Sequence, residues 1–224
     1  MRNFIKWVLN LVLPMRCVAC GRDKTLLCYG CADKLKILRH QECPRCRKAN
    51  KSGRVCCGTD FVLNRLVVTF RYQQNDIIQK LVKQFKYHYS LELARYLRRA
   101  MMKQIIEYFC PPDYIFVPVP LDKKRRRERG FNQAEVLAEN IGPMWDCLQR
   151  KVHDRHQAGL NRRERLTNVI GLFSLKEGFD VRRKRLVLID DVATTGATLN
   201  ECAKVLLEAG AKEVSALVLA RGSG

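Results

Sequence analysis

The sequence predicts an α/β protein with a mostly parallel sheet flanked by helices, preceded by a small cysteine-rich module. After residue 60, stretches with strand character alternate with stretches of helical periodicity, the pattern of a parallel sheet covered on both faces. Eight of the eleven cysteines lie before residue 60. The 224 residues suffice for one full domain and a smaller module. We therefore predict a module at 1–60 and an α/β domain at 61–224.

Breaker residues and capping patterns give the order of elements in the second domain. The helix that follows Leu91 ends before Pro111, where a helix cannot continue. A later helix has Asn132 and Glu135 at its N-cap and N3 positions and stops at Gly142. The expected strands lie at 65–72, 113–120, 185–190 and 213–220, and the expected helices at 77–87, 91–109, 131–142 and 198–210.

The charge balance favours polyanionic partners. The chain has 42 Lys and Arg against 22 Asp and Glu, a formal charge of +20. Nucleic acid, phosphorylated small molecules and anionic lipid surfaces all fit this charge, which alone does not choose among them. Several aromatic residues near basic ones either stack on single-stranded nucleic acid or belong to the core. They are Phe70, Tyr72, Phe85, Tyr87, Tyr89 and Phe131.

The first 17 residues are predicted to be neither a signal peptide nor a membrane span. Lys6 and Asn10 interrupt the apolar residues, so that the longest apolar run has three residues, and no small-residue cleavage site follows. We expect a short helix that packs against the cysteine module, with contact at the inner face of the membrane as the alternative. The protein is predicted to be cytoplasmic, without a transmembrane segment.

Paired cysteines in the first module predict a structural zinc site in a reducing compartment. Cys17 and Cys20 form one CxxC pair, and Cys28 and Cys31 form a second pair seven residues later. Two such pairs supply the four thiolates that structural zinc prefers, the alternative being four unligated thiols. The residues after Cys31, at 32–38, are expected to form a helix that begins at the second pair.

A second zinc site is less regular. Cys43 and Cys46 form a CxxC pair, but Cys57 is followed three residues later by Asp60 rather than by another cysteine. Zinc could be held by Cys43, Cys46, Asp60 and either Cys57 or Cys56, and an empty, degenerate site is an equal alternative.

Two adjacent acids, Asp190 and Asp191, follow four aliphatic residues of a predicted strand. Ligands of open parallel sheets bind at the carboxyl ends of the strands. The loop that follows offers hydroxyl groups and small residues that let backbone N–H groups approach an anion at the start of the next helix. It consists of Ala193, Thr194, Thr195, Gly196, Ala197 and Thr198.

This loop predicts a phosphate site with sugar-binding carboxylates beside it. Thr198 and Glu201 fit a capping box that would fix the start of the helix. The nucleotide-binding patterns GxxxxGK[ST] and GxGxxG are absent. Carboxylates next to a phosphate suit the hydroxyl groups of a sugar, the alternative being an ordinary turn with exposed acids.

A basic run follows the strand at 113–120 and is expected to be a loop. Its position at a strand exit, ahead of a capped helix, favours an anion site over a solvated turn, and diphosphate and a nucleic-acid backbone fit it equally well. The basic residues are Lys123, Lys124, Arg125, Arg126, Arg127 and Arg129.

The stretch around Asp190 closely resembles the signature of the phosphoribosyltransferases, which bind 5-phosphoribosyl 1-diphosphate, usually with Mg²⁺. The resemblance implies a type I phosphoribosyltransferase-like fold, ribose hydroxyls on Asp190 and Asp191, and the 5-phosphate at 193–198. The cysteine pairs, the sequence RGFNQ at 129–133 and a middle motif narrow the resemblance to the ComF family, associated with DNA uptake in naturally competent bacteria. The middle motif is carried by Gln157, Leu160, Arg162, Arg165, Asn168 and Phe173.

The resemblance leaves three functional hypotheses. The first is a protein that handles single-stranded DNA during natural transformation, with other DNA-uptake proteins as partners. The second is an active transferase, similar to the amidophosphoribosyltransferases, that acts on an amine or a nucleobase, although no glutaminase domain is present in the sequence. In the third, 5-phosphoribosyl 1-diphosphate or a nucleotide regulates binding to DNA or to a partner.

Overall fold

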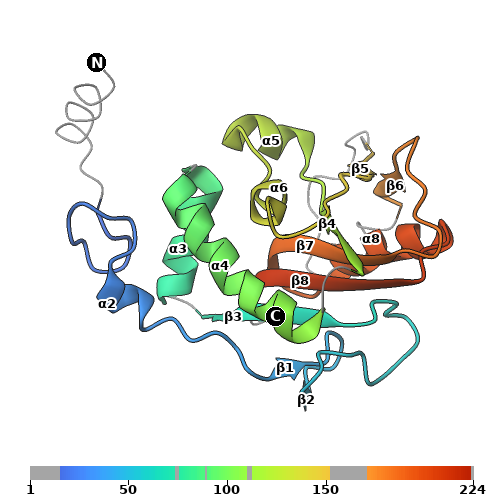
Figure 1. Cartoon of the computed structure of the whole chain (residues 1–224), viewed down its shortest axis with the longest axis horizontal. Helices are drawn as coiled ribbons and strands as arrows, with labels where there is room; N and C mark the ends of the chain where they lie inside the picture. Colours follow the sequence, from blue (N-terminus) through green and yellow to red (C-terminus); the bar gives the residue numbers. More distant parts are fainter. Residues whose placement is uncertain (1–15, 74–75, 89, 110–112, 152–170, 223–224) are drawn as a thin grey trace, which may run out of the picture.

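A four-stranded parallel sheet lies at the centre of the computed structural model, which describes residues 16–73, 76–88, 90–109, 113–151 and 171–222. The strands are arranged in the order β3-β8-β7-β4, and each neighbouring pair is parallel (Figure 1). The α/β class predicted from the sequence is therefore confirmed. The strand bounds are Leu66–Tyr72 for β3, Tyr114–Pro118 for β4, Arg185–Ala193 for β7 and Glu213–Gly222 for β8.

Helices cover both faces of the sheet, because successive strand residues point to opposite sides. Val187 and Ile189 of β7 belong to the core under α3, α4 and α6, whereas Leu186 and Leu188 belong to the core under α8. A short antiparallel hairpin, β5–β6, packs beside α8. These elements span Ile77–Tyr87 (α3), Leu91–Tyr108 (α4), Gln133–Ala138 (α6), Ala197–Glu208 (α8), Leu148–Arg150 (β5) and Phe173–Leu175 (β6).

The cysteine module runs along the free edge of β3. It contains the short helix α2 (Tyr29–Ala32) and a hairpin of β1 (Gln41–Glu42) and β2 (Ala49–Asn50), which lies below β3 in Figure 1. An edge strand presents unpaired backbone groups, and Gln41 pairs with two of them. Its buried amide accepts from Val68 N at 2.8 Å and donates to Val68 O at 3.2 Å. The module thereby covers the edge of the sheet.

Two predicted helices differ in the structure. The helix expected at 32–38 is wrong: α2 ends at Ala32, and the backbone N–H of Leu38 donates to Thr69 O of β3 at 2.9 Å. Leu35 and Ile37 pack against the core from an extended segment, so contact with the sheet overrides local helical preference. The helix expected at 131–142 begins after its predicted cap, Asn132, but ends at Ala138, before Gly142.

The basic run is a helix rather than the expected loop. It forms α5 (Lys123–Arg129), with Asp122 as its N-cap and Gly130 as its C-cap. The carboxylate of Asp122 accepts from Lys124 N at 2.9 Å, and Gly130 adopts the left-handed conformation with φ +78°. These two caps stabilise a short helix in a run of like charges.

Two predicted features lie outside the described residues: the N-terminal helix and the middle motif from Gln157 to Asn168. The last member of that motif, Phe173, is buried in β6. Within the part of the chain that the structure describes, no helix combines the length and the apolar character needed to cross a bilayer.

Candidate functional site

The acidic pair lies within β7, which continues past it to Ala193 instead of ending at Asp190 as expected. Residues 194–196 then turn the chain into α8. Gly196 adopts φ +80°, and a Cβ atom there would lie 2.9 Å from the ring of Phe61. Both the conformation and the close approach therefore require glycine at the start of the helix.

The capping box predicted for Thr198 and Glu201 is wrong. Gly196 is the N-cap of α8 and offers no side chain, and the hydroxyl of Thr195 accepts from Ala197 N at 3.3 Å. Glu201 lies inside the helix, where its carboxylate accepts from Gly171 N at 2.7 Å. Because the first turn of a helix has backbone N–H groups without helical partners, the remaining amides of this turn suit a phosphate.

The carboxylate of Asp191 in β7 forms an ion pair with a lysine of helix α3. Its side chain is buried, and Lys86 Nζ of α3 lies 3.2 Å from its Oδ2 atom. The same Oδ2 atom accepts no aligned hydrogen bond. The ammonium group thus balances the charge of this buried carboxylate.

Asp190 is a poor acid in this environment. Burial and the charge of Asp191 raise its pKa to about 7, against the smaller opposing effects of its hydrogen bond from Asp191 N at 2.8 Å and of the charges on Lys86 and Arg129. Asp190 is therefore about half protonated at neutral pH, whereas an ordinary aspartate is fully ionised there.

Polar residues from α5 and α6 complete this neighbourhood. Gln133 is buried, donates to Lys86 O at 3.3 Å and accepts from Arg129 at 2.9 Å. The guanidinium of Arg129 also lies over the ring of Tyr87, 5.7 Å from its centroid. Asn132 caps α6 and donates to Val119 O at 3.1 Å, which fixes α6 to the exit of β4.

The six basic residues of α5 divide into paired and unpaired groups. Arg126 forms a bidentate pair with Glu135, at 2.7 and 3.1 Å, and Lys124 lies 3.8 Å from Glu128. Arg129 is engaged by Gln133 and Tyr87. Across the described ranges, no carboxylate forms an ion pair with the remaining three, Lys123, Arg125 and Arg127, all of them exposed.

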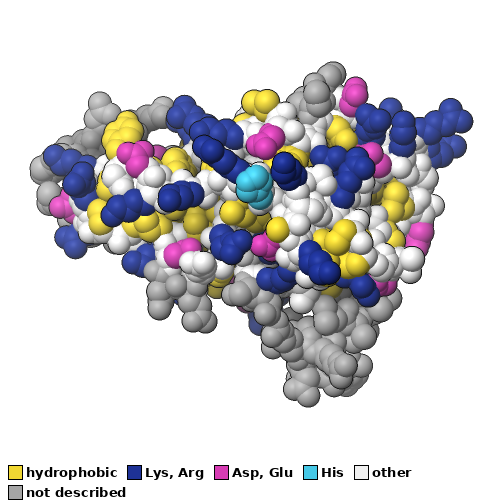
Figure 2. All heavy atoms as spheres, turned by 90° about the horizontal axis from the view of Figure 1, so that it is seen from below, with side chains coloured by type: hydrophobic (Ala, Val, Ile, Leu, Met, Phe, Trp, Pro, Cys, Tyr) yellow, Lys and Arg dark blue, Asp and Glu magenta, His cyan; other side chains and the backbone are white. Residues whose placement is uncertain are grey.

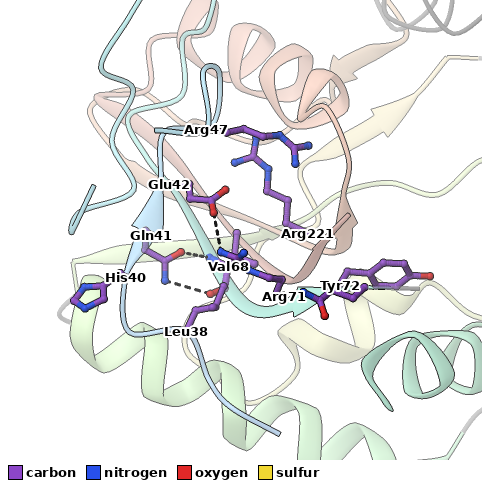
Figure 3. Close-up of a pocket in the computed structure, with 10 residues that line it drawn as sticks. Leu38, His40, Gln41, Glu42, Arg47, Val68, Arg71, Tyr72 and Arg221 are labelled. Atoms are coloured by element: carbon purple, nitrogen blue, oxygen red, sulfur yellow. Dashed lines mark hydrogen bonds and ion pairs between the residues drawn. The ribbon is translucent and has the colours of Figure 1, made fainter. Parts of the chain in front are cut away.

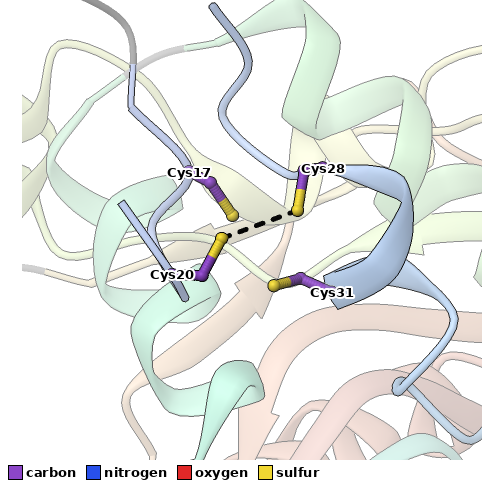
Figure 4. A group of neighbouring side chains, drawn as sticks. All are labelled: Cys17, Cys20, Cys28 and Cys31. Atoms are coloured by element: carbon purple, nitrogen blue, oxygen red, sulfur yellow. Dashed lines mark hydrogen bonds between the residues drawn. The ribbon is translucent and has the colours of Figure 1, made fainter. Parts of the chain in front are cut away.

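The first four predicted zinc ligands converge on one point (Figure 4). The sulfur atoms of Cys17, Cys20, Cys28 and Cys31 all lie within 4.8 Å of one another, and those of Cys20 and Cys28 are 3.6 Å apart. A tetrahedral zinc site with Zn–S bonds of about 2.3 Å places sulfur atoms about 3.8 Å apart. The residues therefore fit a structural zinc ion.

The second cluster uses both adjacent cysteines. Cys43, Cys46, Cys56 and Cys57 gather within the same limit, with sulfur separations of 3.9 Å (Cys43–Cys57) and 3.4 Å (Cys46–Cys56). Asp60 is not part of this group, because its carboxylate pairs with Arg45 Nε at 2.8 Å. Although the cysteine spacing is irregular, these residues form a second set of four thiols.

The thiols of each cluster hold their protons unequally. Burial opposes ionisation of Cys17, but backbone N–H groups of Cys28, Cys20 and Ala19 lower its pKa to about 6. The hydrogen bond with the Cys28 side chain and burial raise the pKa of Cys31 to about 12. Four thiolates repel one another unless a cation joins them, and a bound zinc ion supplies that charge.

Two family models match separate parts of the chain. A family model of the double zinc ribbon domain matches residues 8–59, and one of the phosphoribosyl transferase domain matches residues 117–224. Competence protein ComFC of Streptococcus pneumoniae is 30% identical over 229 residues, covering 92% of this chain and 100% of that protein. The chain belongs to the ComF family.

Other ComF-family relatives agree along most of their length. Competence protein ComFC of Bacillus subtilis is 30% identical, covering 87% of this chain and 84% of the relative. DNA utilization protein YhgH of Escherichia coli is 29% identical, covering 94% and 99%. Among solved structures, a purine phosphoribosyltransferase from Pyrococcus horikoshii matches 59% of this chain and 85% of its own, with 18% identity and a TM-score of 0.37.

In this ComF-family chain the second zinc ribbon touches the loop at the end of β7. Arg47, one residue after Cys46, donates to Thr194 O at 3.0 Å and to Gly222 O at 3.1 Å. In return Arg221 of β8 donates to the carbonyl groups of Cys43 and Pro44. These reciprocal bonds join the metal-binding turn to the predicted phosphate loop.

Sequence reasoning missed Lys86, Gln133 and Arg47 as site residues. Lys86 stands in a helix whose local pattern indicates only the element, and its contacts with Gln133 and Asp191 span 47 or more residues. Gln133 belongs to the RGFNQ stretch, but no local pattern predicts its bond to Lys86. Arg47 reaches a loop 147 residues later. Of the aromatic candidates, Phe70 and Phe85 are core residues and Tyr87 is exposed, while Tyr89 lies outside the described residues.

We expect the ComF-family chain to bind two zinc ions, because each cluster offers a complete set of four thiolates. Cys46→Ser should reduce the content to one ion per chain, and Asp60→Asn, the matched control, should leave two. Zinc is measured colorimetrically after the thiols are modified. Loss of one ion in Asp60→Asn would show that the carboxylate is a ligand.

We expect Asp190→Asn to stabilise the folded chain more at about pH 8 than at about pH 5.5. Because the pKa of Asp190 is raised to about 7, the folded state binds more protons than the unfolded state between the ordinary carboxyl pKa and about 7. Stability therefore falls as pH rises through this window, and asparagine removes the effect.

The measurement is urea-induced unfolding of the zinc-loaded protein at both pH values. Asp180→Asn is the control: its hydrogen bonds and ion pair with Arg182 lower the pKa of Asp180 to about 2, so its contribution is constant across the window. An Asp190→Asn variant that is equally affected at both pH values would contradict the raised pKa of Asp190.

Proposed function

We propose that this chain is a DNA-uptake protein that binds 5-phosphoribosyl 1-diphosphate at the end of β7 and handles single-stranded DNA on its basic surface. The observation that carries the first part is the acidic pair directly ahead of the glycine-started helix α8. The support for the second is membership of a family whose named relatives are competence and DNA utilization proteins.

The β7–α8 junction has a group for each part of the sugar phosphate. The 5-phosphate lies at residues 194–198, where the amides of the first turn of α8 and the threonine hydroxyls donate to its oxygens. Asp190 and Asp191 accept hydrogen bonds from the ribose hydroxyls. Lys86 offsets the charge that the second carboxylate brings to the ligand.

The acidic pair also fits a magnesium complex of the ligand. Carboxylate oxygens are the donors that Mg²⁺ prefers, usually with several waters retained. When bound, the ion neutralises charge on the diphosphate and favours the ionised form of Asp190. The unpaired cations of α5 follow β4, the strand next to β7, and supply further positive charge for the diphosphate.

Basic side chains over much of the surface support the DNA-handling part. Figure 2 shows Lys and Arg side chains in several groups over the face seen from below, with Asp and Glu between them. With a formal charge of +20, the chain attracts a polyanion at long range. Phosphate contacts of exposed bases release counterions, which makes such binding depend on salt without requiring a base sequence.

The sugar-phosphate site is tested by calorimetry of 5-phosphoribosyl 1-diphosphate with Mg²⁺ at moderate salt. We expect the wild type to bind and the Asp190→Asn/Asp191→Asn double variant to lose binding, because amide groups hold sugar hydroxyls more weakly and attract no cation. Asp180→Asn, an exposed acid at the opposite end of the sheet, should bind like the wild type. No binding by the wild type would overturn this part of the proposal.

The DNA-handling part is tested by fluorescence anisotropy of labelled oligothymidylate over a range of salt concentrations. Arg127→Ala should reduce the slope of log K against log salt by about 0.7, the value for one phosphate contact on a single strand. Arg126→Ala on the same helix should change it little, because Glu135 already neutralises Arg126. Binding without salt dependence would exclude a phosphate-contacting surface.

A further inference from the structure

A small pocket lies between the second zinc ribbon and the free edge of the sheet (Figure 3). Its walls come from the segment 38–42, from Arg47 and from the ends of β3 and β8, and its volume is about 220 Å³. This is smaller than the roughly 300–1,000 Å³ of sites for drug-sized ligands. It has room for a phosphate group and part of what is attached to it.

The register of the sheet places two cations side by side in this pocket. Arg71 of β3 pairs with Arg221 of β8, and both line the pocket. Like charges directly opposite each other on neighbouring strands destabilise a sheet. Arg47 adds a third guanidinium, and Figure 3 shows its side chain beside that of Arg221.

Arg221 is buried and incompletely bonded. Arg221 is 7% exposed, and among the described residues its terminal nitrogens donate to the carbonyl groups of Cys43 and Pro44. Its Nε atom is buried without a hydrogen-bond partner. A buried donor without an acceptor is unfavourable, and an anion in the pocket would remove that deficit.

Few negative charges balance these arginines. Glu42 pairs with Arg71 at 3.0 Å, and within the described part of the chain no carboxylate forms an ion pair with Arg47 or Arg221. The zinc tetrathiolate beyond Cys43, with a net charge of −2, is the other counter-charge within reach. Arg45 already hydrogen-bonds the Cys57 side chain of that centre.

We propose that this pocket binds the phosphate group of a nucleotide. Guanidinium groups bind phosphate oxygens in bidentate pairs. The Nη2 group of Arg47 donates to Thr194 O and Gly222 O, and its Nε and Nη1 carry further N–H donors. His40 and Tyr72 line the pocket and lie at opposite ends of it in Figure 3, where bases on either side of the phosphate can stack. This pair of rings favours a nucleotide over an inorganic anion.

The phosphate group can belong to a free mononucleotide or to the backbone of single-stranded DNA. Binding of a DNA strand rests on the DNA handling proposed above, and binding of a free mononucleotide does not. The pocket adjoins the proposed sugar-phosphate loop, because Arg47 bonds Thr194 O and Arg221 stands in register with Ala193, but the residues that line it lie outside that loop.

The test compares Arg71→Ala with Arg182→Ala. Each variant removes one exposed arginine that pairs with one acid, Glu42 at 3.0 Å or Asp180 at 2.9 Å, but Arg182 lies before β7, at the opposite end of the sheet. Thymidine monophosphate is titrated by calorimetry and labelled oligothymidylate by anisotropy, both at one salt concentration. Arg71→Ala should reduce the affinity for the probe that occupies the pocket about tenfold, and Arg182→Ala should reduce it less than about twofold.

The outcomes separate the two sources and the two proposals. Selective loss of the monophosphate identifies a free nucleotide, and selective loss of the oligonucleotide alone identifies a strand. If Arg71→Ala and Arg182→Ala change the affinity for each probe equally, the pocket does not bind a nucleotide and its arginines serve only to offset the charge of the zinc centre. That result would contradict the pocket proposal and leave the proposed DNA handling intact. Monophosphate binding that survives Arg71→Ala but disappears in Asp190→Asn/Asp191→Asn would place the nucleotide at the sugar-phosphate loop and also overturn it.

Zinc content and circular dichroism establish that the variants are folded. If Arg71→Ala loses zinc, Arg71→Lys keeps the charge but lacks the planar fork. Its affinity for the bound probe should then fall below that of Arg182→Ala, and an unchanged affinity would count against the pocket.

Discussion

The parallel register of β3, β8 and β7 is the constraint on which the functional half of this molecule depends. It sets Arg71 beside Arg221 and Arg221 beside Ala193, so that three strands distant in sequence end in one row. A shift of one residue in β8 would move Arg221 to the other face of the sheet. The carbonyl groups of Cys43 and Pro44 would then lose their donor, and the zinc ribbon would lose one of its attachments beside the loop that follows β7.

The zinc ribbons contribute to the fold of the larger domain as well as to their own. Without the amide of Gln41, Val68 at the edge of the sheet would have an N–H and a carbonyl group facing water or another chain. Asn200 of α8 adds a second tie, because its side chain bonds both Asp60 O at 3.0 Å and Val62 N at 2.7 Å. Metal binding, which fixes the turns around Cys43, is thereby linked to the position of α8 and its first turn.

The parts of the site that the sequence predicted are those defined by local patterns. Four aliphatic residues, two acids and a threonine- and glycine-rich loop are contiguous, and their chemistry follows from one strand and the helix after it. The CxxC pairs are equally local. Lys86 opposite Asp191 and Arg47 beneath Thr194 arise only when distant elements meet, and nothing in the surrounding residues distinguishes them from other surface cations.

Local patterns also failed where tertiary contacts compete with them. Residues 32–38 have helical spacing, yet the free edge of β3 offers hydrogen bonds that an isolated helix cannot match. Asp60 stands at the position where a regular CxxC pair would have its second cysteine, but its carboxylate pairs with Arg45. The adjacent Cys56 and Cys57 complete the site instead. Spacing alone could not show that two neighbouring cysteines point to the same metal.

The acidic pair is compatible with a chain of charge +20 because its charge is largely cancelled before any ligand arrives. Lys86 balances Asp191, and Asp190 retains a proton until about pH 7 because burial and its neighbour disfavour the carboxylate. Sugar hydroxyls or a cation stabilise the ionised form and would draw that proton off. The acidic pair therefore adds little net negative charge to the surface, which is compatible with the proposed binding of a sugar phosphate and of nucleic acid.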